Sequence, residues 1–365
     1  MIDSILYGDC RETLKTVTNS SVQMCVTSPP YYGLRDYGTG TWIGGDSNCN
    51  HMRDTKVNPS NCITGHKNHD KMAGVGDAIY KSVCPKCGAV RQDDQIGLEE
   101  TPEEYIDQLV NVFKEVRNVL TDDGTCWVNL GDSYYNYRPG KGQGLPKQSV
   151  SNTKQDLPDV CPRRGNRISG LKEKDLIGIP WLFAFAMRAD GWYLRQDIIW
   201  NKPNPMPESV KDRCTKSHEY IFLFSKNKKY YYNNEAIKED AVGERWAGNK
   251  PININNSKDN ENTFSGLTRE RQMVYDKRNK RSVWKVTTKP YKGAHFAVFP
   301  SELIEPCILA ASEEYDTILD PFMGSGTTAY TARRNNRHYY GCELHEDYGH
   351  LIQQRVPPSV LELSL

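Results

Sequence analysis

The stretch Ile318-Leu319-Asp320-Pro321-Phe322-Met323-Gly324-Ser325-Gly326-Thr327-Thr328 decides the fold, because it reads as a strand, a glycine turn and the start of a helix. Glycines in such a turn let the backbone approach a ligand closely where the helix begins. The turn is neither a Walker loop, which needs Gly-Lys-Ser/Thr, nor a complete dinucleotide fingerprint, which needs a third glycine. Glu343 ends the next apolar run, where an acid would bind a ribose diol. This context predicts a cofactor site rather than a purely structural turn.

The rest of the chain alternates strand-like and helix-like segments. Short apolar runs that end in turn signals are typical of buried strands in a parallel sheet. Thr101-Pro102-Glu103-Glu104 has the features of a helix N-terminus, and Asp122-Asp123-Gly124 is expected to end that helix. The alternation predicts an α/β domain with a largely parallel sheet. The predicted strands are Ser4–Tyr7, Val22–Thr27, Cys126–Leu130, Tyr193–Trp200, Tyr220–Phe224, Tyr315–Leu319 and His338–Cys342, and the further helices are Leu182–Met187 and Thr327–Arg334.

The composition excludes several classes of protein. The chain has 365 residues, a formal net charge of +1 and 37% hydrophobic residues, which excludes wholesale disorder and a histone-like polycation. It has no apolar run of about 18 residues and no basic and apolar leader, so we expect a cytoplasmic protein with no membrane partner. Its 11 cysteines favour free thiols or metal ligands over a disulfide framework.

The segment Ser28-Pro29-Pro30-Tyr31 follows the predicted strand Val22–Thr27. Ligands of open α/β sheets bind beyond the carboxyl ends of the strands. Two prolines fix the backbone and remove two N–H donors, which leaves the Ser28 hydroxyl and the carbonyls of Ser28 and Pro29 as acceptors beside the Tyr31 ring. This arrangement suits a planar group with an –NH2, such as the exocyclic amine of a base. Taken alone, Ser-Pro-Pro-Tyr is more often a plain loop.

Together, the two segments resemble those of the amino-group DNA methyltransferases, which methylate adenine N6 or cytosine N4. Ser-Pro-Pro-Tyr comes before Phe-x-Gly-x-Gly, which is the order of the circularly rearranged beta-type branch found in restriction–modification systems and phages. Further blocks that match this family cover most of the chain, namely Gly8-Asp9-Cys10, Trp127–Asp132, Ile199–Pro205, His218–Phe222 and Phe296–Leu303.

The resemblance implies a doubly wound, mostly parallel seven-stranded sheet with one antiparallel strand, and S-adenosylmethionine as the cofactor. It makes Ser28, Pro29, Pro30 and Tyr31 the candidate catalytic residues, with the target base flipped out of the duplex onto the Tyr31 ring. Hydrogen bonds to Ser28 and Pro29 would localise the lone pair of the base amine, which then attacks the methyl group in line. The candidate cofactor residues are Asp9, Phe299, Pro300, Asp320, Pro321, Phe322, Gly324, Gly326, Thr327 and Glu343.

The sequence leaves several alternative functions undecided, some within this family and some outside it. Serine before Pro-Pro-Tyr favours cytosine N4 as the methyl acceptor, with adenine N6 as the alternative. Methylation of RNA, or of protein amines and amides, is a second class, and a non-catalytic zinc-bearing DNA-binding protein is a third. The third class is disfavoured because Asp320, Gly324, Gly326 and Glu343 are all intact.

Three polar stretches interrupt the alternation and are interpreted as insertions on one core. Loops longer than about 15 residues in a compact domain are usually functional or disordered. The expected catalytic core is residues 1–41, 95–233 and 290–365. The insertions are a zinc-binding segment at 42–94, a basic loop at 137–174 and a target-recognition segment at 234–289.

A metal site is expected in the first insertion. Cys84-Pro85-Lys86-Cys87-Gly88 has the Cys-x-x-Cys-Gly spacing of a zinc knuckle, and Cys49 and His51 can supply the other two ligands. A redox pair would be expected in a βα context instead. One structural zinc would supply folding energy to this polar segment. The rival ligands are Cys62, His66 and His69.

Basic charge is concentrated in one part of the chain. Residues 202–292 carry 20 Lys and Arg against 11 Asp and Glu, which indicates a face for a polyanion, although a solvated surface is the alternative. We expect this span to bind double-stranded DNA, with Trp246, Phe264, Tyr275 and Trp284 interleaved for stacking. A cognate restriction endonuclease and the choice between monomer and dimer stay open. The cations expected to meet DNA are Lys202, Arg269, Arg271, Lys277 and Arg278.

Overall fold

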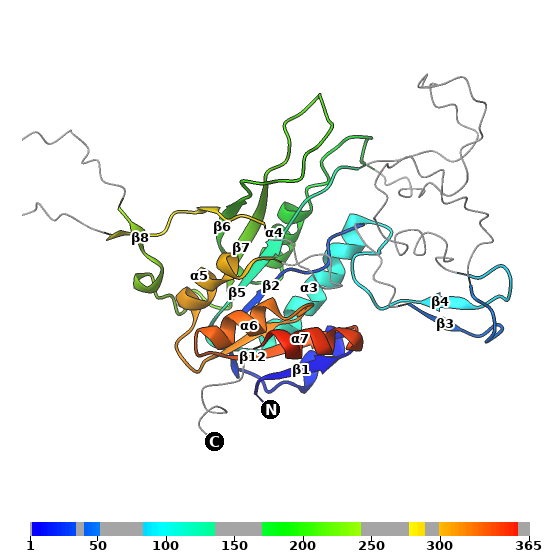
Figure 1. Cartoon of the computed structure of the whole chain (residues 1–365), viewed down its shortest axis with the longest axis horizontal. Coiled ribbons are helices and arrows are strands. Elements are labelled where there is room, and N and C mark those ends of the chain that lie inside the picture. Colours follow the sequence, from blue (N-terminus) through cyan, green and yellow to red (C-terminus); the bar gives the residue numbers. More distant parts are fainter. Residues whose placement is uncertain are drawn as a thin grey trace, which may run out of the picture.

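The computed structural model describes residues 2–33, 40–51, 83–135, 170–241, 277–288 and 299–356, and its centre is one eight-stranded sheet (Figure 1). Seven strands are those expected of the doubly wound sheet, and β10 adds an eighth at one edge. In spatial order the strands are β1 (Ser4–Tyr7), β12 (His338–Glu343), β11 (Thr317–Asp320), β2 (Val22–Thr27), β5 (Leu120–Leu130), β7 (His218–Ser225), β6 (Tyr193–Asn201) and β10 (Val283–Lys285).

One strand runs against the others. β7 pairs antiparallel with both β5 and β6, and every other pair in this sheet is parallel. The carboxyl ends of the parallel strands therefore meet at one edge, where the amino end of β7 joins them. At the centre of the sheet β11 lies directly beside β2, with Leu319 opposite Cys25. The chain leaves these two strands toward opposite sides of the sheet, and such a switch point is where open α/β sheets bind ligands.

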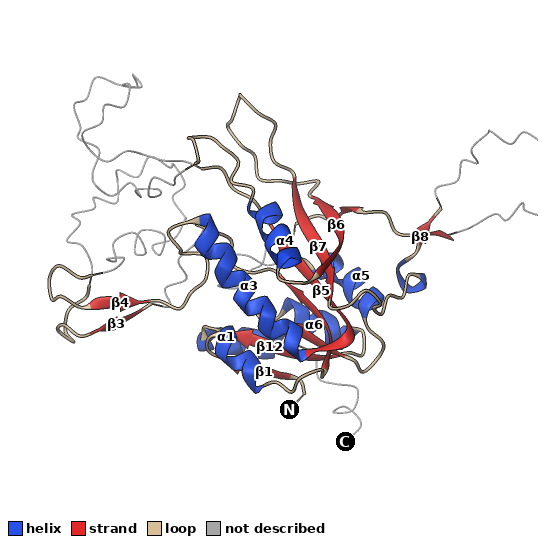
Figure 2. Cartoon of the chain, turned by 180° about the vertical axis from the view of Figure 1, so that it is seen from behind, coloured by secondary structure: helices blue, strands red, loops and turns tan. Residues whose placement is uncertain are grey.

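Helices cover both faces of the sheet. Figure 1 shows α5 (Ser301–Ala311), α6 (Thr327–Arg334) and α7 (Gly349–Arg355) on the near face. Figure 2, from behind, shows α1 (Cys10–Thr13), α3 (Pro102–Val119) and α4 (Ile179–Ala189) on the other. Each layer contributes to its own cluster of buried apolar side chains, with Phe113 and Phe183 in one and Leu303 and Ile352 in the other.

The start of helix α3 was predicted correctly from the sequence, and its end was not. Thr101 caps the helix and Glu104 returns the hydrogen bond, so the predicted start is confirmed. The expected end at Asp122–Gly124 is wrong, because the helix ends at Val119 and β5 begins at Leu120. The residues that were expected to end the helix, Asp122–Gly124, lie instead in the first half of β5. This part of β5 lies beside β2, and the side chain of Gln23 in β2 donates a hydrogen bond to Asp123.

Two small sheets extend away from the core. β3 (Thr41–Ile43) and β4 (Val90–Gln92) form an antiparallel pair on one side, and β8 (Glu239–Asp240) and β9 (Lys277–Arg278) form another on the opposite side (Figure 1). The span expected as the third insertion therefore also contributes β10 to the main sheet. Trp284 of β10 is 6% exposed and packs in the core, so its expected role in stacking on bases is wrong.

Parts of the expected insertions lie outside the described residues. These parts include Cys62, His66, His69, Trp246, Phe264, Tyr275 and most of the basic loop 137–174. Within the described ranges, no helix combines the length and apolar character needed to cross a membrane.

Candidate active site

The candidate cofactor residues gather where three neighbouring strands end. Gly8 follows β1 and donates its N–H to the carbonyl of Glu343, the last residue of β12. Met323, in the turn after β11, donates to the carbonyl of Cys342. The structure therefore brings Asp9, Glu343 and the glycine turn 321–326 to one edge, although more than 300 residues separate Asp9 from the turn in the chain.

Glu343 is tied to the glycine turn by its carboxylate. The N–H of Gly324 donates to Oε2 at 2.7 Å, and the N–H of His345 donates to Oε1 at 2.9 Å. The residue is 9% exposed, and this burial raises the pKa of its carboxyl group to about 7. Gly324 has a φ of 56°, a conformation that favours glycine, so the turn is built without a side chain beside Glu343.

Asp320 points into the protein and connects the two loops of the site. Its Oδ1 accepts a hydrogen bond from the Thr27 hydroxyl at 2.6 Å and one from the Phe322 N–H at 3.0 Å, and its Oδ2 accepts one from the Thr328 hydroxyl at 2.6 Å. The residue is 1% exposed. Burial raises its pKa to about 6, against the effect of the three hydrogen bonds. Asp320 therefore ties the glycine turn to the residue that precedes Ser28.

The other predicted cofactor residues lie on the same edge or at the starts of neighbouring helices. Asp9 caps the four-residue helix α1 and forms an ion pair with Arg11 at 2.6 Å. Phe299 and Pro300 precede α5, and Pro300 is its N-cap. Pro321 and Phe322 follow β11, and Phe322 packs against the core. Gly326, with a φ of 79°, precedes Thr327, whose hydroxyl accepts a hydrogen bond from Arg355 of α7.

The Ser28-Pro29-Pro30-Tyr31 loop leaves β2 next to the glycine turn. The carbonyl of Pro30 accepts a 2.7 Å hydrogen bond from the Tyr105 hydroxyl of α3. Within the described residues, the carbonyls of Ser28 and Pro29 accept no hydrogen bond. Pro29 is buried and Ser28 is partly exposed. The carbonyls of Ser28 and Pro29, two of the predicted acceptors, therefore have no partner among the described residues.

Tyr31 is held by side chains that the sequence did not single out as site residues. Its hydroxyl lies 2.8 Å from Oε2 of Glu219 and 3.2 Å from Oδ1 of Asn129. Lys202 forms an ion pair with Oε1 of Glu219. The signal was present, because Asn129 and Glu219, like Lys202, which was predicted to contact DNA, lie in blocks that match the family. Their meeting depends on the order of β5, β7 and β6 in the sheet.

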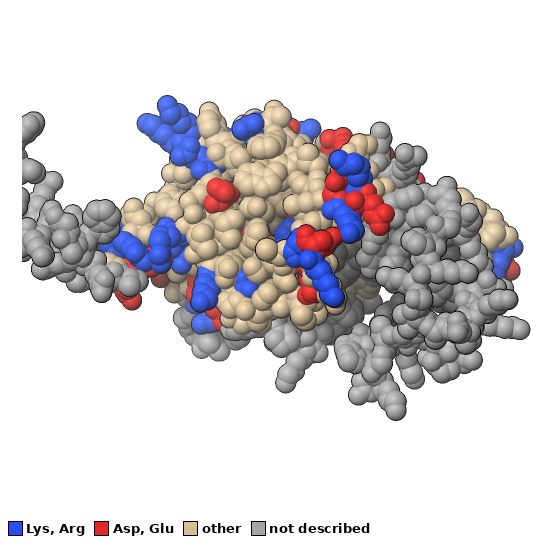
Figure 3. Space-filling view, turned by 90° about the horizontal axis from the view of Figure 1, so that it is seen from above, with Lys and Arg blue, Asp and Glu red and all other residues tan. Residues whose placement is uncertain are grey.

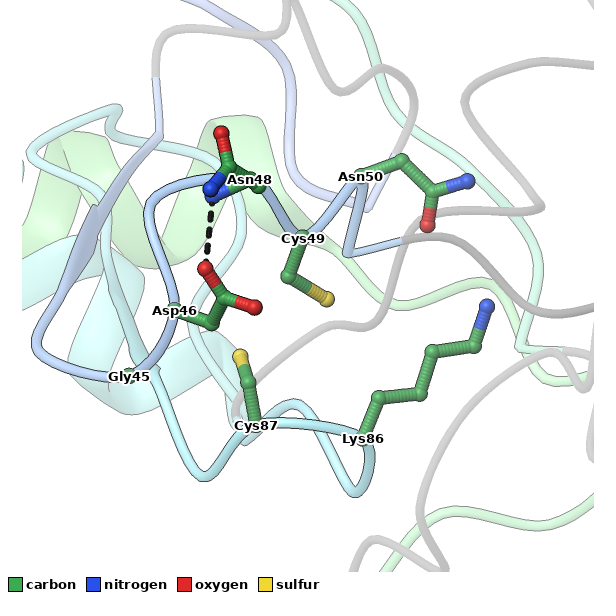
Figure 4. Close-up of a pocket in the computed structure, with 7 residues that line it drawn as sticks. All are labelled: Gly45, Asp46, Asn48, Cys49, Asn50, Lys86 and Cys87. Carbon is green, nitrogen blue, oxygen red and sulfur yellow. Dashed lines mark hydrogen bonds between the residues drawn. The ribbon is translucent and has the colours of Figure 1, made fainter.

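The four predicted metal ligands come together outside the core. The ligand atoms of Cys49, His51, Cys84 and Cys87 all lie within 4.8 Å of one another. Cys49 Sγ is 3.7 Å from Cys84 Sγ, and Cys87 Sγ is 3.5 Å from Nδ1 of His51. Figure 4 shows the thiols of Cys49 and Cys87 turned toward one another beside an open cavity.

The backbone around this cluster fits a metal-binding turn. The N–H of Gly88 returns to the carbonyl of Cys84 at 2.8 Å, and the N–H of Cys84 donates to Ala89 at the same distance. A Cβ at Gly45 would lie 2.8 Å from Cys87 Sγ, so glycine is needed for this approach. The Trp42 ring stacks on His51 with centroids 4.4 Å apart, which fixes the imidazole.

The three predicted DNA-contacting cations that the structure describes do not form one group. Arg269 and Arg271 lie outside the described residues. Lys277 and Arg278 form β9, where Arg278 pairs with Glu239 at 2.9 Å, and Lys202 is paired with Glu219 instead of standing free. Figure 3 shows described Lys and Arg side chains in separate groups with Asp and Glu among them.

A doubly wound sheet with a glycine turn and a Ser-Pro-Pro-Tyr loop at its switch point is the arrangement expected of an amino-group DNA methyltransferase. Comparison with known proteins gives the same class. The family model for DNA methylases of the N6/N4 type matches residues 22–354, so the chain belongs to this family.

Individual relatives are similar along nearly the whole chain. The Type II methyltransferase M.Cfr9I of Citrobacter freundii is 38% identical over 354 residues, 97% of this chain and 87% of the relative. M.SmaI of Serratia marcescens is 38% identical over 359 residues, 96% of this chain and 90% of the relative. Among solved structures, PvuII DNA methyltransferase (cytosine-N4-specific) has a TM-score of 0.54 at 15% identity, covering 99% of this chain and 88% of that chain. At this identity the likeness concerns the fold.

Proposed function

We propose that this chain is a site-specific methyltransferase that transfers the methyl group of S-adenosylmethionine to N4 of cytosine in double-stranded DNA. The observation that carries the proposal is the connection of two loops at the switch point, because Asp320, the residue before the glycine turn, is hydrogen-bonded to Thr27, the residue before Ser28. Neighbouring strands are about 4.8 Å apart, so a methyl donor at one loop and a base amine at the other would meet.

The residues at the cofactor edge fit S-adenosylmethionine. The Glu343 carboxylate is oriented by two N–H donors and keeps lone pairs for a ribose diol. The positive φ of Gly324 lets the turn bring its backbone N–H to the Glu343 carboxylate without a side chain between them. When bound, the cofactor supplies an electrophilic methyl sulfonium group.

The Ser28 loop would prepare the base for attack. An exocyclic amine is a weak nucleophile because its lone pair is delocalised into the ring. The Ser28 hydroxyl and the Pro29 carbonyl would accept its two hydrogens and localise that pair, while the prolines keep these acceptors fixed. The base has to leave the duplex to reach them, since the loop lies at the edge of the sheet. Catalysis would rest on positioning and electrostatics, without a covalent enzyme intermediate.

Cytosine N4 is preferred over adenine N6 because Ser28 stands before Pro-Pro-Tyr. The name of the PvuII neighbour, cytosine-N4-specific, points the same way. Adenine N6 is the alternative within the same site chemistry.

The test is to incubate the protein with S-adenosylmethionine and duplex DNA and to identify the methylated nucleoside by mass spectrometry. We expect N4-methylcytosine, and we expect Ser28→Ala to lower kcat by about 10²-fold, the usual worth of a positioned donor or acceptor in the reacting site. Cofactor affinity should not change. N6-methyladenine alone would overturn the base assignment, and no methylated DNA would overturn the function.

We also propose that Cys49, His51, Cys84 and Cys87 hold one structural zinc ion. Tetrahedral zinc with bonds of about 2.3 Å to sulfur and about 2.0 Å to nitrogen separates two sulfurs by about 3.8 Å, and a sulfur from a nitrogen by about 3.5 Å. The separations of 3.7 Å between Cys49 and Cys84 and 3.5 Å between Cys87 and His51 support this geometry. The ion would stabilise a β3–β4 pair whose residues Ile43 and Val90 are more than half exposed.

Elemental analysis of the purified protein tests the metal. We expect about one zinc per chain, lost in the double variant Cys84→Ser/Cys87→Ser, with cofactor binding retained. Cys214→Ser is the matched control, because this exposed thiol is remote in sequence from the cluster. Metal-free protein in which hydrogen exchange still protects β3 and β4 would contradict the proposal.

A further inference from the structure

Four strand ends meet at the tip of Tyr31. Tyr31 follows β2, Asn129 lies near the end of β5, Glu219 lies at the start of β7 and Lys202 follows β6. Oε2 of Glu219 accepts hydrogen bonds from the Tyr31 hydroxyl at 2.8 Å and from Nδ2 of Asn129 at 3.3 Å. Asn129 is fixed in turn, because Nδ2 also donates to the carbonyl of Tyr220 at 3.0 Å.

The charge pair in this group is largely withdrawn from water. The side chains of Lys202 and Glu219 are 18% and 15% exposed, and Lys202 Nζ lies 4.2 Å from the centre of the Trp200 ring. Removing such charges from water is costly unless each is paired and hydrogen-bonded. A solvated cation on a DNA-binding face would not need this environment, so the arrangement points to a role in holding Glu219.

The Tyr31 ring is constrained from a second side. A Cβ at Gly131 would lie 2.6 Å from Cε2 of the Tyr31 ring, so the ring packs against bare backbone after β5. Burial and the nearby Glu219 carboxylate raise the pKa of Tyr31 well above its usual value, which keeps the hydroxyl protonated as a donor. With its hydroxyl bonded and this side covered, the plane of the ring next to Ser28 is determined.

We propose that Glu219, held by Lys202, is a positioning residue that fixes the Tyr31 ring for the flipped target base. This inference rests on the proposed methyl transfer to a base at Ser28. It assigns Lys202 to the pair with Glu219, not to a phosphate contact. Loss of the pair changes how the base is presented and leaves the cofactor edge, three strands away across β2, unchanged.

A double-mutant cycle with Tyr31→Phe and Glu219→Gln tests the coupling. Because Glu219 acts through the Tyr31 hydroxyl, we expect each single variant to lower kcat by about ten- to a hundredfold, and the double variant to be no slower than the worse single variant. Cofactor affinity, measured by calorimetry, should stay at the wild-type value. Glu235→Gln, which breaks the exposed pair with Lys238, is the matched control and should leave kcat unchanged.

The variant Lys202→Met distinguishes two roles of Lys202, namely holding Glu219 in place and contacting a DNA phosphate. A lost phosphate contact reduces the salt slope of DNA binding by about one unit. We expect the slope to be unchanged while kcat falls, and Lys202→Arg to restore most of the activity. A reduced slope with wild-type kcat would overturn the proposal, as would multiplicative effects in the double-mutant cycle.

Unfolding free energies of the same four proteins provide a readout that does not depend on the substrate. We expect the effects of Tyr31→Phe and Glu219→Gln on stability to be non-additive, because the two side chains share one hydrogen bond. Additive effects would overturn the coupling. If the wild type methylates no DNA while this coupling is present, the proposed function fails and the contact between Tyr31 and Glu219 stands.

Discussion

Asp320 and Glu343 end neighbouring strands, yet their carboxylates face different surroundings. The oxygens of Asp320 bond to Thr27, Thr328 and Phe322 inside the protein. Those of Glu343 bond to the backbone of the glycine turn and of the residues that follow β12. The sequence predicted both as cofactor residues because both close apolar strands. We therefore propose Glu343 for direct contact with the cofactor, whereas Asp320 holds the two loops together.

The pKa of Glu343 predicts how cofactor binding depends on pH. Burial raises this pKa to about 7, and the ionised form accepts hydrogen bonds best, so binding to a ribose diol should favour deprotonation. The affinity for S-adenosylmethionine should therefore fall as the pH is lowered from 8 to 6, by up to about tenfold per pH unit. Calorimetry at several pH values measures this. Glu343→Gln should bind more weakly with a flat profile, and a flat profile in the wild type would contradict the prediction.

Asp320 should make stability depend on pH in a defined direction. Its folded-state pKa of about 6 is raised above the usual value for an aspartate, so its contribution is fully present below about pH 4 and is lost as the pH rises through 6. Wild-type protein should gain about 1 kcal/mol at pH 5 relative to pH 8 from this group. In Asp320→Asn this part of the pH dependence should disappear. Urea unfolding of both proteins at the two pH values is the measurement, and parallel curves would contradict it.

Single residues could be predicted where their chemistry depends on local sequence. Ser28, the glycine turn and the Cys-x-x-Cys pair each carry a recognisable local pattern, and the structure brings the residues of each pattern together. The partners of Tyr31 could not be found in this way, because Asn129 and Glu219 are 90 residues apart and meet only through the order of their strands.

At the scale of elements, helix α3 supports the Ser28 loop from behind. The Tyr105 side chain is fully buried, and its hydroxyl is bonded to the carbonyl of Pro30. Tyr105→Phe should cost about 1–3 kcal/mol of stability, since it leaves this carbonyl without a partner, and should lower kcat with little change in cofactor affinity.

Tyr32→Phe is the control for this prediction, because its hydroxyl bonds to Glu100 and leaves the prolines untouched. Urea unfolding and steady-state kinetics measure both variants. An equal loss of kcat in the two variants would show that the Pro30 contact has no special role.

Most elements could be predicted from periodicity and turn signals, and the failures have physical reasons. β1, β2 and α6 have the predicted bounds, because local turn residues end them. β5 starts earlier than predicted because pairing with β2 draws Leu120 and the polar residues after it into an extended strand. β10 was missed because three residues, of which two are exposed, have no alternating pattern long enough to predict a strand.

At the scale of the whole molecule, the third insertion contributes a strand to the main sheet in addition to the target-recognition role that we propose for it. β10 adds to the main sheet through β6, so a replacement of all of 234–289 would remove this edge strand and the buried Trp284. Replacement of residues 242–276 alone by a short linker should keep stability and cofactor binding and abolish site-specific methylation, because target reading is expected there. Sequencing of methylated positions checks this. If the same sites are still methylated, target reading lies in the zinc-binding segment or in residues 137–174.

The order of β1, β12 and β11 also has a consequence for how the protein is made. Asp3 bonds to Tyr339, 336 positions away, and β1 has no partner in the main sheet other than β12. Contacts between residues so distant in sequence form slowly, because a very long chain must close first. During translation, the edge of the sheet that carries Asp9 and Glu343 cannot form until Glu343 has left the ribosome. A chain whose translation has not yet reached β11 would therefore carry the Ser28 loop but lack the glycine turn, and it could not yet methylate DNA.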